Sequence, residues 1–423
     1  MIPKLRFKDD NGNDFPAWNT TVRLEEISAF ITKGATPTTY GFEWQIKGIY
    51  FFRNDCIKNN IFVYGDYSYI SEEANEFLKR SEIRGDDIVI AITGDIGKVG
   101  LVPRKIKKAN INQHLARIRI VKDAIPYFVY SYLGSNEMQR NYRKIKTGLS
   151  MAQLSLSQIR ETRIPVVSIM EQQKIAEFLM EMDRIIETKK ETVVAWQERK
   201  KGVMQKIFSQ EVRFKDEDGE NFPDWKEKKI SDIFFKIKDK NKDGKNQNVI
   251  TNSAEYGLIN QREFFEKDIA VDGKMENYTV IKTGDFVYNP RKSKQAPYGP
   301  FNCYQLEEEG IVSPLYTCLR PKGNADEKYL LWYFKSGSWY RFIYENGAQN
   351  GARHDRVGMT DSLMQEIPVY LPQALEEQQK IADCLSALDD VINNYKETLT
   401  AWQELKKGLL QQIFGEYETF SVK

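Results

Sequence analysis

The sequence predicts an α+β protein in which two α/β domains, related by a pseudo-two-fold axis, are separated by an antiparallel coiled coil of two long helices. Three observations predict this architecture. A stretch in the middle of the chain has the heptad pattern of a long helix, the same stretch returns at the end of the chain, and strand-like runs precede each copy.

The first long helix is predicted between Ser168 and Phe208. Ser168 with Glu171 is a capping-box pattern, in which the hydroxyl accepts from the Glu171 amide and the carboxylate reaches back to the Ser168 amide. Pro165 keeps the helix from starting earlier. About 40 residues give a rod of roughly 60 Å, which is longer than a globular core needs. The apolar seam, in alternating steps of four and three, consists of Ile175, Leu179, Met182, Ile186, Val193, Trp196, Val203 and Ile207.

The second long helix repeats the first at a shift of 206 residues. Glu171–Ala176 returns as Glu377–Ala382, and the lysine that interrupts the seam recurs as Lys200 and Lys406. Shared interruptions indicate an internal duplication. We expect Trp196 and Trp402 to be buried where the helices meet. The second seam consists of Ile381, Leu385, Leu388, Ile392, Tyr395, Leu399, Trp402, Leu409 and Ile413.

A short motif opens each half of the chain. Arg6-Phe7-Lys8-Asp9 followed by Phe15-Pro16-Ala17-Trp18 recurs as Arg213-Phe214-Lys215-Asp216 and Phe222-Pro223-Asp224-Trp225. The simplest interpretation is a docking clip whose Phe and Trp cover a helix end.

The globular stretch of each half contains candidate strands, then a helix, then a polar loop. Both halves enter their rod through Ile-Pro-Val, at residues 164–166 and 367–369. The predicted strands are 48–52, 87–92, 116–121, 284–288 and 310–316, the helices are 126–144 and 327–344, and the loops are 146–153 and 346–356.

The middles of the two halves align only at isolated points, such as Gly85-Asp86 with Gly284-Asp285. One frame with varied contents is typical of two reading heads of different specificity. It is equally typical of a structural duplication that has drifted, and spacing alone leaves both open.

Composition excludes several classes of protein. With 62 Lys+Arg against 60 Asp+Glu, the net charge is only +2 and does not by itself indicate nucleic-acid binding. Any nucleic acid would have to bind at local basic patches. Four cysteines at no ligand spacing and two histidines disfavour a zinc site and a disulfide framework. The sequence contains no signal peptide and no apolar run long enough to span a membrane, so we expect a cytoplasmic protein.

The Glu-Gln-Gln-Lys-Ile-Ala helix starts, the Trp-Gln-Glu…Lys-Lys-Gly helix ends and the Phe-Pro-x-Trp clips resemble a specificity (S) subunit of a type I restriction–modification enzyme. So do the Gly-Asp-Ile/Phe-Val strands and the Gly-Ala-Arg-His loop before Ile-Pro-Val. The resemblance covers the whole chain. It implies a target recognition domain in each half, at residues 1–166 and 210–372, with spacer helices at 167–209 and 373–423.

The resemblance also implies partners and cofactors. Each recognition domain would read one half of a bipartite double-stranded DNA site, with the spacer set by the helices. Two modification subunits would supply S-adenosylmethionine and adenine methylation, and restriction subunits would supply ATP- and Mg-dependent translocation and cleavage. This chain itself would carry no cofactor and no catalysis.

Polar and basic loop residues are the candidates for reading bases. Arginine can bond both acceptors of guanine, and Asn or Gln can pair with adenine. The alternative is that they are solvated loops or phosphate contacts. The first half lacks the Arg-His pair in its loop at 146–153. The candidates are Arg353, His354, Arg356, Arg291, Lys292 and Lys294 in the second half and Lys98, Asn112, Gln113 and His114 in the first.

Catalytic patterns are absent from the sequence. Gly94-Asp95-Ile96-Gly97-Lys98 lacks the first glycine of a phosphate loop, and Asn289-Pro290-Arg291 is not an adenine-methyltransferase signature. Glu187-Thr188-Lys189 has the spacing of a nuclease half-motif but sits on the predicted coiled coil. Two hypotheses therefore remain, a non-catalytic DNA-specificity subunit and a coiled-coil scaffold that does not touch DNA. A fragment of a fused restriction enzyme is disfavoured.

Overall fold

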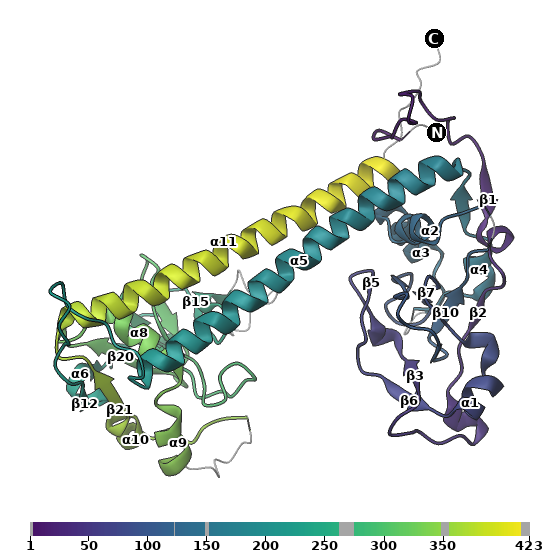
Figure 1. Cartoon of the computed structure of the whole chain (residues 1–423). Coiled ribbons are helices and arrows are strands. Elements are labelled where there is room, and N and C mark those ends of the chain that lie inside the picture. The colour runs from purple at the N-terminus through teal and green to yellow at the C-terminus, as the bar shows by residue number, and fades with distance from the viewer. Residues whose placement is uncertain (1–2, 122, 149–151, 262–274, 348–354, 416–423) are drawn as a thin grey trace. The chain divides into compact units, whose positions relative to one another are not determined.

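The computed structural model describes residues 3–121, 123–148, 152–261, 275–347 and 355–415. The chain divides into two compact units that are not continuous in sequence. Unit 1 comprises residues 1–190 and 397–423, and unit 2 comprises residues 191–396. Each unit therefore contains one globular domain, the first half of one long helix and the second half of the other (Figure 1).

The helices confirm the two predicted rods. Both long helices have 40 residues and begin and end at positions related by the repeat. The helices are α1 (Glu72–Phe77), α2 (Pro126–Leu133), α3 (Asn136–Ile145), α4 (Leu156–Arg160), α5 (Ile169–Phe208), α6 (Ile230–Ile233), α8 (Glu327–Ser336), α9 (Tyr340–Asn346), α10 (Asp361–Glu366) and α11 (Leu375–Phe414).

The strands are short and confirm the predicted α/β character of both domains. In unit 1 they are β1 (Thr21–Arg23), β2 (Thr32–Lys33), β3 (Ile49–Phe52), β4 (Ile57–Lys58), β5 (Ile61–Phe62), β6 (Ser68–Ile70), β7 (Ile88–Ala91), β8 (Val99–Leu101), β9 (Ala109–Ile111), β10 (Leu115–Ile118) and β11 (Arg163–Pro165). In unit 2 they are β12 (Lys226–Lys229), β13 (Phe234–Lys236), β14 (Ile250–Ser253), β15 (Gly257–Asn260), β16 (Thr279–Ile281), β17 (Phe286–Tyr288), β18 (Phe301–Cys303), β19 (Gly310–Val312), β20 (Thr317–Pro321) and β21 (Pro368–Leu371).

The central sheets of the two domains have the same strand order, although their sequences do not align. The order is β2-β10-β7-β8 in the first domain and β13-β20-β17-β18 in the second. All neighbouring strands in both sheets are antiparallel. The duplication therefore extends through the variable middles.

The equivalence of the sheets corrects the predicted alignment by one residue. Asp86 and Gly284 both have positive φ, at 68° and 88°. Asp87 accepts a bidentate pair from Arg119, and Asp285 accepts the same pair from Arg320. Asp86-Asp87 thus corresponds to Gly284-Asp285. The predicted match of Gly85-Asp86 with Gly284-Asp285 was wrong by one residue, because Asp87 and not Asp86 makes the arginine contact that Asp285 makes.

The predicted helices at 126–144 and 327–344 are each two helices. In the second domain α8 ends at Ser336, because the next residue, Gly337, has a φ of 74°, which is costly for residues with a side chain. In the first domain Ser135 ends the continuity of α2 by capping α3, since its hydroxyl accepts from Met138 N–H.

The long helices pack antiparallel within each unit. In unit 1 Ile413 packs in one cluster with Ile175 and Leu179, and in unit 2 Ile207 packs with Ile381 and Leu385. All seam residues are at least half-buried, and ten of the 17 are fully buried. Trp196 and Trp402 are only half-buried, so the expectation that they are fully buried was wrong. The Trp196 ring stacks on Tyr395, with the ring centroids 6.2 Å apart, and the Arg199 guanidinium lies 5.2 Å from the Trp196 centroid.

The lysines that interrupt the seams bind aspartates across the helix pair. Lys200 Nζ lies 2.5 Å from Asp389 Oδ1, and Lys406 pairs with Asp183. The two ion pairs are related by the internal repeat. They give each unit one charged contact that fixes the register of its helices.

The clips dock on buried glutamates at the helix starts. Arg6 makes a bidentate pair with Glu171, at 2.9 and 2.8 Å, and Trp18 Nε1 donates to the same carboxylate at 3.0 Å. Ser168 Oγ accepts from Glu171 N–H, as the capping pattern predicted. The Glu171 carboxylate, however, accepts from Arg6 and Trp18 of the clip, whereas the capping-box pattern predicts that it accepts from the Ser168 amide.

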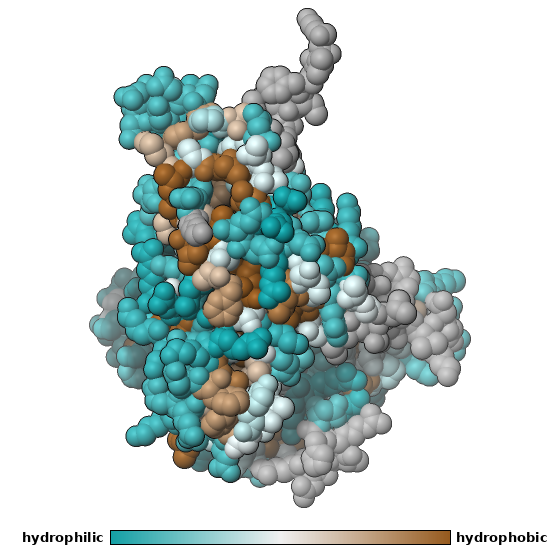
Figure 2. Space-filling model, turned by 90° about the vertical axis from the view of Figure 1, so that its right-hand side faces the viewer, coloured by the Kyte–Doolittle hydropathy of each residue, from teal (hydrophilic) through white to brown (hydrophobic). Residues whose placement is uncertain are grey.

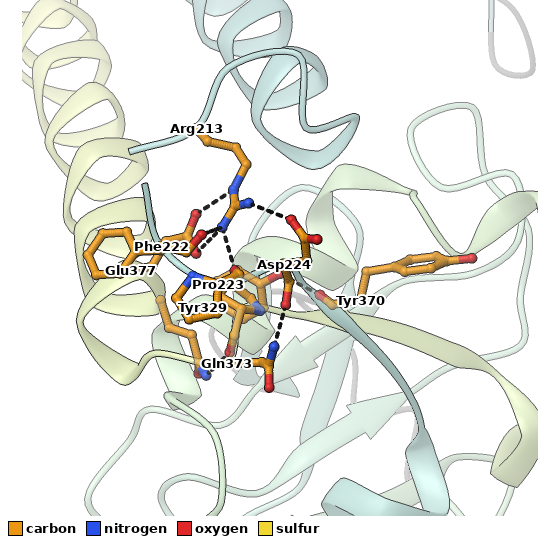
Figure 3. Close-up of polar contacts among 10 residues, drawn as sticks. Arg213, Phe222, Pro223, Asp224, Tyr329, Tyr370, Gln373 and Glu377 are labelled. Carbon is orange, nitrogen blue, oxygen red and sulfur yellow. Dashed lines mark hydrogen bonds and ion pairs between the residues drawn. The ribbon is translucent and has the colours of Figure 1, made fainter. Parts of the chain in front are cut away.

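The second clip repeats this contact in unit 2 (Figure 3). Arg213 lies 3.0 and 2.9 Å from the two carboxylate oxygens of Glu377, whose side chain is fully buried. Arg213 also donates to the Pro223 carbonyl at 2.7 Å. Trp225 is different from Trp18, because its buried Nε1 has no hydrogen-bond partner within the described residues.

The glutamine that follows each buried glutamate fixes the globular domain to its helix. Gln172 Oε1 accepts from Ile125 N–H at the start of α2, and Gln378 Oε1 accepts from Asp326 N–H at the start of α8, both at 2.8 Å. The repeated Glu-Gln pair is therefore the joint between each clip, helix and domain.

Candidate nucleic-acid interface

The segment that follows strand β17, residues 289–294, is here named the second tip. Its backbone pairs with the chain that leads into α10. Lys292 N–H donates to the Asp355 carbonyl, and Val357 N–H donates to the Pro290 carbonyl, both at 2.9 Å. Arg291 and Arg356 form an antiparallel bridge. The structure thus brings together two clusters of predicted readers that are separated by more than sixty residues in the sequence. Arg353 and His354 lie outside the described residues.

A buried amide network supports the second tip. Asn289 Oδ1 accepts from Arg291 N–H at 3.0 Å, and Asn289 Nδ2 donates to the Asn252 carbonyl at 3.1 Å. Asn302 Nδ2 donates to Asn252 Oδ1 at 2.7 Å. All three side chains are buried. Fully bonded buried amides specify one backbone conformation, so the network presents Arg291 on a fixed turn.

The predicted basic side chains of the second tip are available to a ligand. Arg291, Lys292 and Lys294 are exposed, and none of the three makes a side-chain hydrogen bond or ion pair with any described residue. Arg356 is half-buried, and its Nε lies 3.8 Å from Asp355 Oδ2 but has no hydrogen-bond partner in the described part of the chain. A cluster of unpaired guanidinium and ammonium groups suits an anionic or acceptor-rich ligand.

The first tip consists of residues 93–98 and 112–114, which flank the end of strand β7. Ala91 N–H donates to the Lys98 carbonyl at 2.8 Å, and Ile92 N–H donates to the His114 carbonyl at 2.9 Å. Lys98 on one side and Gln113 with His114 on the other therefore flank the end of strand β7. Gln113 Oε1 accepts from Thr36 Oγ at 2.5 Å.

Asn112 is a correction to the predicted readers. Its side chain is 6% exposed, and its Oδ1 accepts from His114 N–H at 3.2 Å. The amide is thus used inside the domain, where it shapes the turn that carries Gln113 and His114. Sequence reasoning took a polar residue in a loop as a reader, but this loop lies against strand β3, where Asn112 N–H donates to the Phe52 carbonyl.

The loop after α3 reaches the first tip in the same way that residues 355–357 reach the second. Gly94 N–H donates to the Ala152 carbonyl at 3.1 Å, and Thr93 bridges Gln153. In each domain, therefore, the end of a central strand, β7 or β17, is paired with the loop that follows helix α3 or α9. The sequence carried no signal for this pairing, because the paired segments are distant in the chain.

The titratable groups give no indication of catalysis. Burial raises the pKa of the Cys318 and Cys303 thiols to about 12, which keeps both protonated at neutral pH. No group of three or more His, Cys, Asp or Glu side chains that could hold a metal ion occurs among the described residues. None of the helices in the described ranges is long and apolar enough to cross a membrane.

A duplicated frame that carries two domains with matched sheets and different tips defines a class of protein with two recognition heads. The family model for the type I restriction modification DNA specificity domain matches the chain twice, at residues 17–195 and 223–401. The chain belongs to this family and is a type I specificity subunit with two recognition domains.

Relatives of known annotation support the family. The chain is 25% identical over 363 residues to the putative type I restriction enzyme MjaX specificity subunit of Methanocaldococcus jannaschii, a match covering 80% of this chain and 79% of the relative. It is 34% identical over 107 residues to the EcoBI specificity subunit of Escherichia coli, covering 25% and 22% of the two chains.

Solved structures share the fold. The type I restriction-modification S subunit from M. genitalium aligns over 99% of this chain and 100% of its own, with 15% identity and a TM-score of 0.53. A chain from a study of complex assembly in the type I R-M system aligns over 96% and 100%, with 17% identity and a TM-score of 0.56. The match to the family model disfavours the hypothesis of a coiled-coil scaffold that does not touch DNA.

Proposed function

We propose that each recognition domain reads one half of a bipartite, asymmetric site in double-stranded DNA, and that the two long helices set the spacer between the halves. One observation carries the proposal. Two sheets of the same strand order end in tips of different chemistry, with Arg291 and Lys292 in one and Gln113 and His114 in the other. The same frame with different donors would read different bases.

Catalysis on the DNA would belong to partner subunits. Two modification subunits would bind S-adenosylmethionine and methylate adenine, and restriction subunits would use ATP and Mg²⁺. This chain would supply only sequence recognition and a frame for assembly.

An exposed helix face that occurs twice supports the docking of two identical partners. On α5 it consists of Glu191, Ala195, Glu198, Gly202 and Gln205, and on α11 the same five residue types recur as Glu397, Ala401, Glu404, Gly408 and Gln411. Their spacing of four and three residues places each set on one face. Exposed positions in the first halves of the helices mostly differ, as at Glu181 and Ala387 or Arg184 and Asp390.

The glycine in each face has no explanation inside the chain. A Cβ added to Gly202 or Gly408 would meet nothing within 4 Å. Glycine within a helix is less favourable than alanine by about 1 kcal/mol. A partner helix that approaches closely would account for a glycine in both copies. Apolar side chains are also exposed at both helix starts, where Ile169 is 50% and Leu375 53% exposed. Figure 2 shows apolar residues on the upper part of the molecular face that it draws.

Ala195→Arg is expected to remove one of the two modification subunits, because the long charged side chain occupies the face on α5. Ala401→Arg should remove the other, and the double variant should bind neither. The mass of the co-purified complex measures the stoichiometry. Ala387→Arg is the matched control, since Ala387 is an exposed alanine on α11 outside the repeated face. Full complexes from all three variants would show that the repeated face does not hold the modification subunits.

The function is tested by sequencing the methylated bases in the genome of a host that expresses the chain with its modification subunit. The expected result is methyladenine in one interrupted motif with two different halves. Methylation without a motif, or in one uninterrupted motif, would contradict the proposal.

A further inference from the structure

A polar and basic stripe on helix α3 lies beside the first tip. Gln139 and Arg143 are four residues apart and share one side of the helix, and Lys146 is the residue that follows its last turn. Gln139 Nε2 donates to the Gly97 carbonyl at 2.6 Å. Tyr142, on the buried side, packs so closely that a Cβ on Gly97 would lie 2.9 Å from its ring. The stripe is therefore held against the tip segment that carries Lys98.

The two cations of the stripe are unpaired, whereas the cation of the tip is not. Arg143 and Lys146 are exposed, and the described residues provide neither with an ion pair or a side-chain hydrogen bond. Lys98 Nζ lies 2.6 Å from Asp95 Oδ2, which neutralises its charge locally. Unpaired positive charge at this end of the first domain is therefore on α3 and on the residue that caps its C-terminal end.

The second domain has the opposite arrangement. On its corresponding helix, α9, Arg341 Nε lies 2.8 Å from Glu345. In this domain the exposed cations of the second tip, Arg291, Lys292 and Lys294, are unpaired among the described residues. The same frame thus has free positive charge on the helix in one domain and on the strand end in the other.

We propose that Arg143 and Lys146 bind the DNA phosphate backbone for the first recognition domain. The proposal rests on the proposed DNA-reading function. Cations beside the tip would position the duplex without reading it. Base edges would be left to Gln113 and His114, and Gln113 would exchange its contact with Thr36 for one with a base. The first domain would then need no Arg-His pair in its loop.

The test is the salt dependence of DNA binding by the chain assembled with its modification subunits. Each lost phosphate contact lowers the slope of log K against log salt by about 0.9, so Arg143→Gln with Lys146→Gln should lower it by about two. The methylated motif should not change in either half. Arg84→Gln with Lys107→Gln is the matched control, because both residues are exposed beside Gly85, at the opposite end of strand β7.

Three outcomes would overturn the inference. An unchanged slope in the α3 variant would show that its cations do not contact phosphates. An equal fall in the control variant would show that charge anywhere on the domain has the same effect. A changed base in the first half-site would make these residues readers of sequence. Failure of the proposed function is distinguishable, because the unaltered complex would then bind DNA with a salt-dependent slope but without preference for a motif.

Discussion

Replacing Glu171 by Ala is expected to lower the free energy of unfolding of unit 1 by about 3–5 kcal/mol, because it removes one partner of a buried ion pair. Arg6 would lose both of its carboxylate contacts, and Trp18 Nε1 would lose its acceptor. The side chain of Glu171 is fully buried and that of Arg6 is 15% exposed, so water would compensate little. Denaturant titration that follows tryptophan fluorescence measures the loss.

The internal repeat provides a matched comparison. Glu377→Ala should cost about 1 kcal/mol less than Glu171→Ala, because Glu377 accepts from Arg213 but not from Trp225. Glu177→Ala, an exposed change on the same helix as Glu171, should stay within about 0.5 kcal/mol of the unaltered protein. Equal losses for Glu171 and Glu177 would show that the clip contributes nothing to stability.

Arg291→Ala is expected to relax or abolish reading of the half-site that belongs to the second domain and to leave the other half-site intact. The guanidinium stands on a turn fixed by Asn289, and a bidentate contact to a guanine is worth about 1–3 kcal/mol of discrimination. Sequencing of methylated motifs reports both half-sites in one experiment.

Arg291→Lys is the control for charge. Lysine keeps the positive charge but lacks the planar fork, so the affinity for DNA should be largely retained while the motif relaxes. If both variants kept the original motif in both halves, Arg291 would be a phosphate contact or a solvated residue, and the assignment of the second tip as a reader would be wrong.

The duplication, the two long helices, their seams and the clips were all predictable from sequence. Each depends on spacing within one segment or on identity between two segments, such as Glu171–Ala176 and Glu377–Ala382. Periodicity reports which side of a helix is buried without reference to its partner. The positions of the seam were therefore predicted correctly. The burial of Trp196 and Trp402 was overestimated, because periodicity gives the side of the helix but not how far the partner covers each side chain.

Only the tertiary structure decided the site. The sequence offered Asn112 as a reader, but strand β3 covers it, and its oxygen accepts from His114. The approach of Arg356 to Arg291 depends on a pairing between segments with no shared pattern. The sequence alone does not distinguish the unpaired cations Arg143 and Lys146 from Lys98. The structure does, because Lys98 is paired with Asp95.

The sequence by itself determined the frame of this specificity subunit, because a frame made twice leaves matching residues at matching intervals, including Lys200 and Lys406. The tertiary structure alone decided that these lysines bind Asp389 and Asp183, and that the dissimilar middles share one strand order. The physical reason is that backbone pairing in a sheet is nearly independent of side-chain identity. A sheet can therefore keep its order while its sequence, and with it the chemistry of its tip, changes.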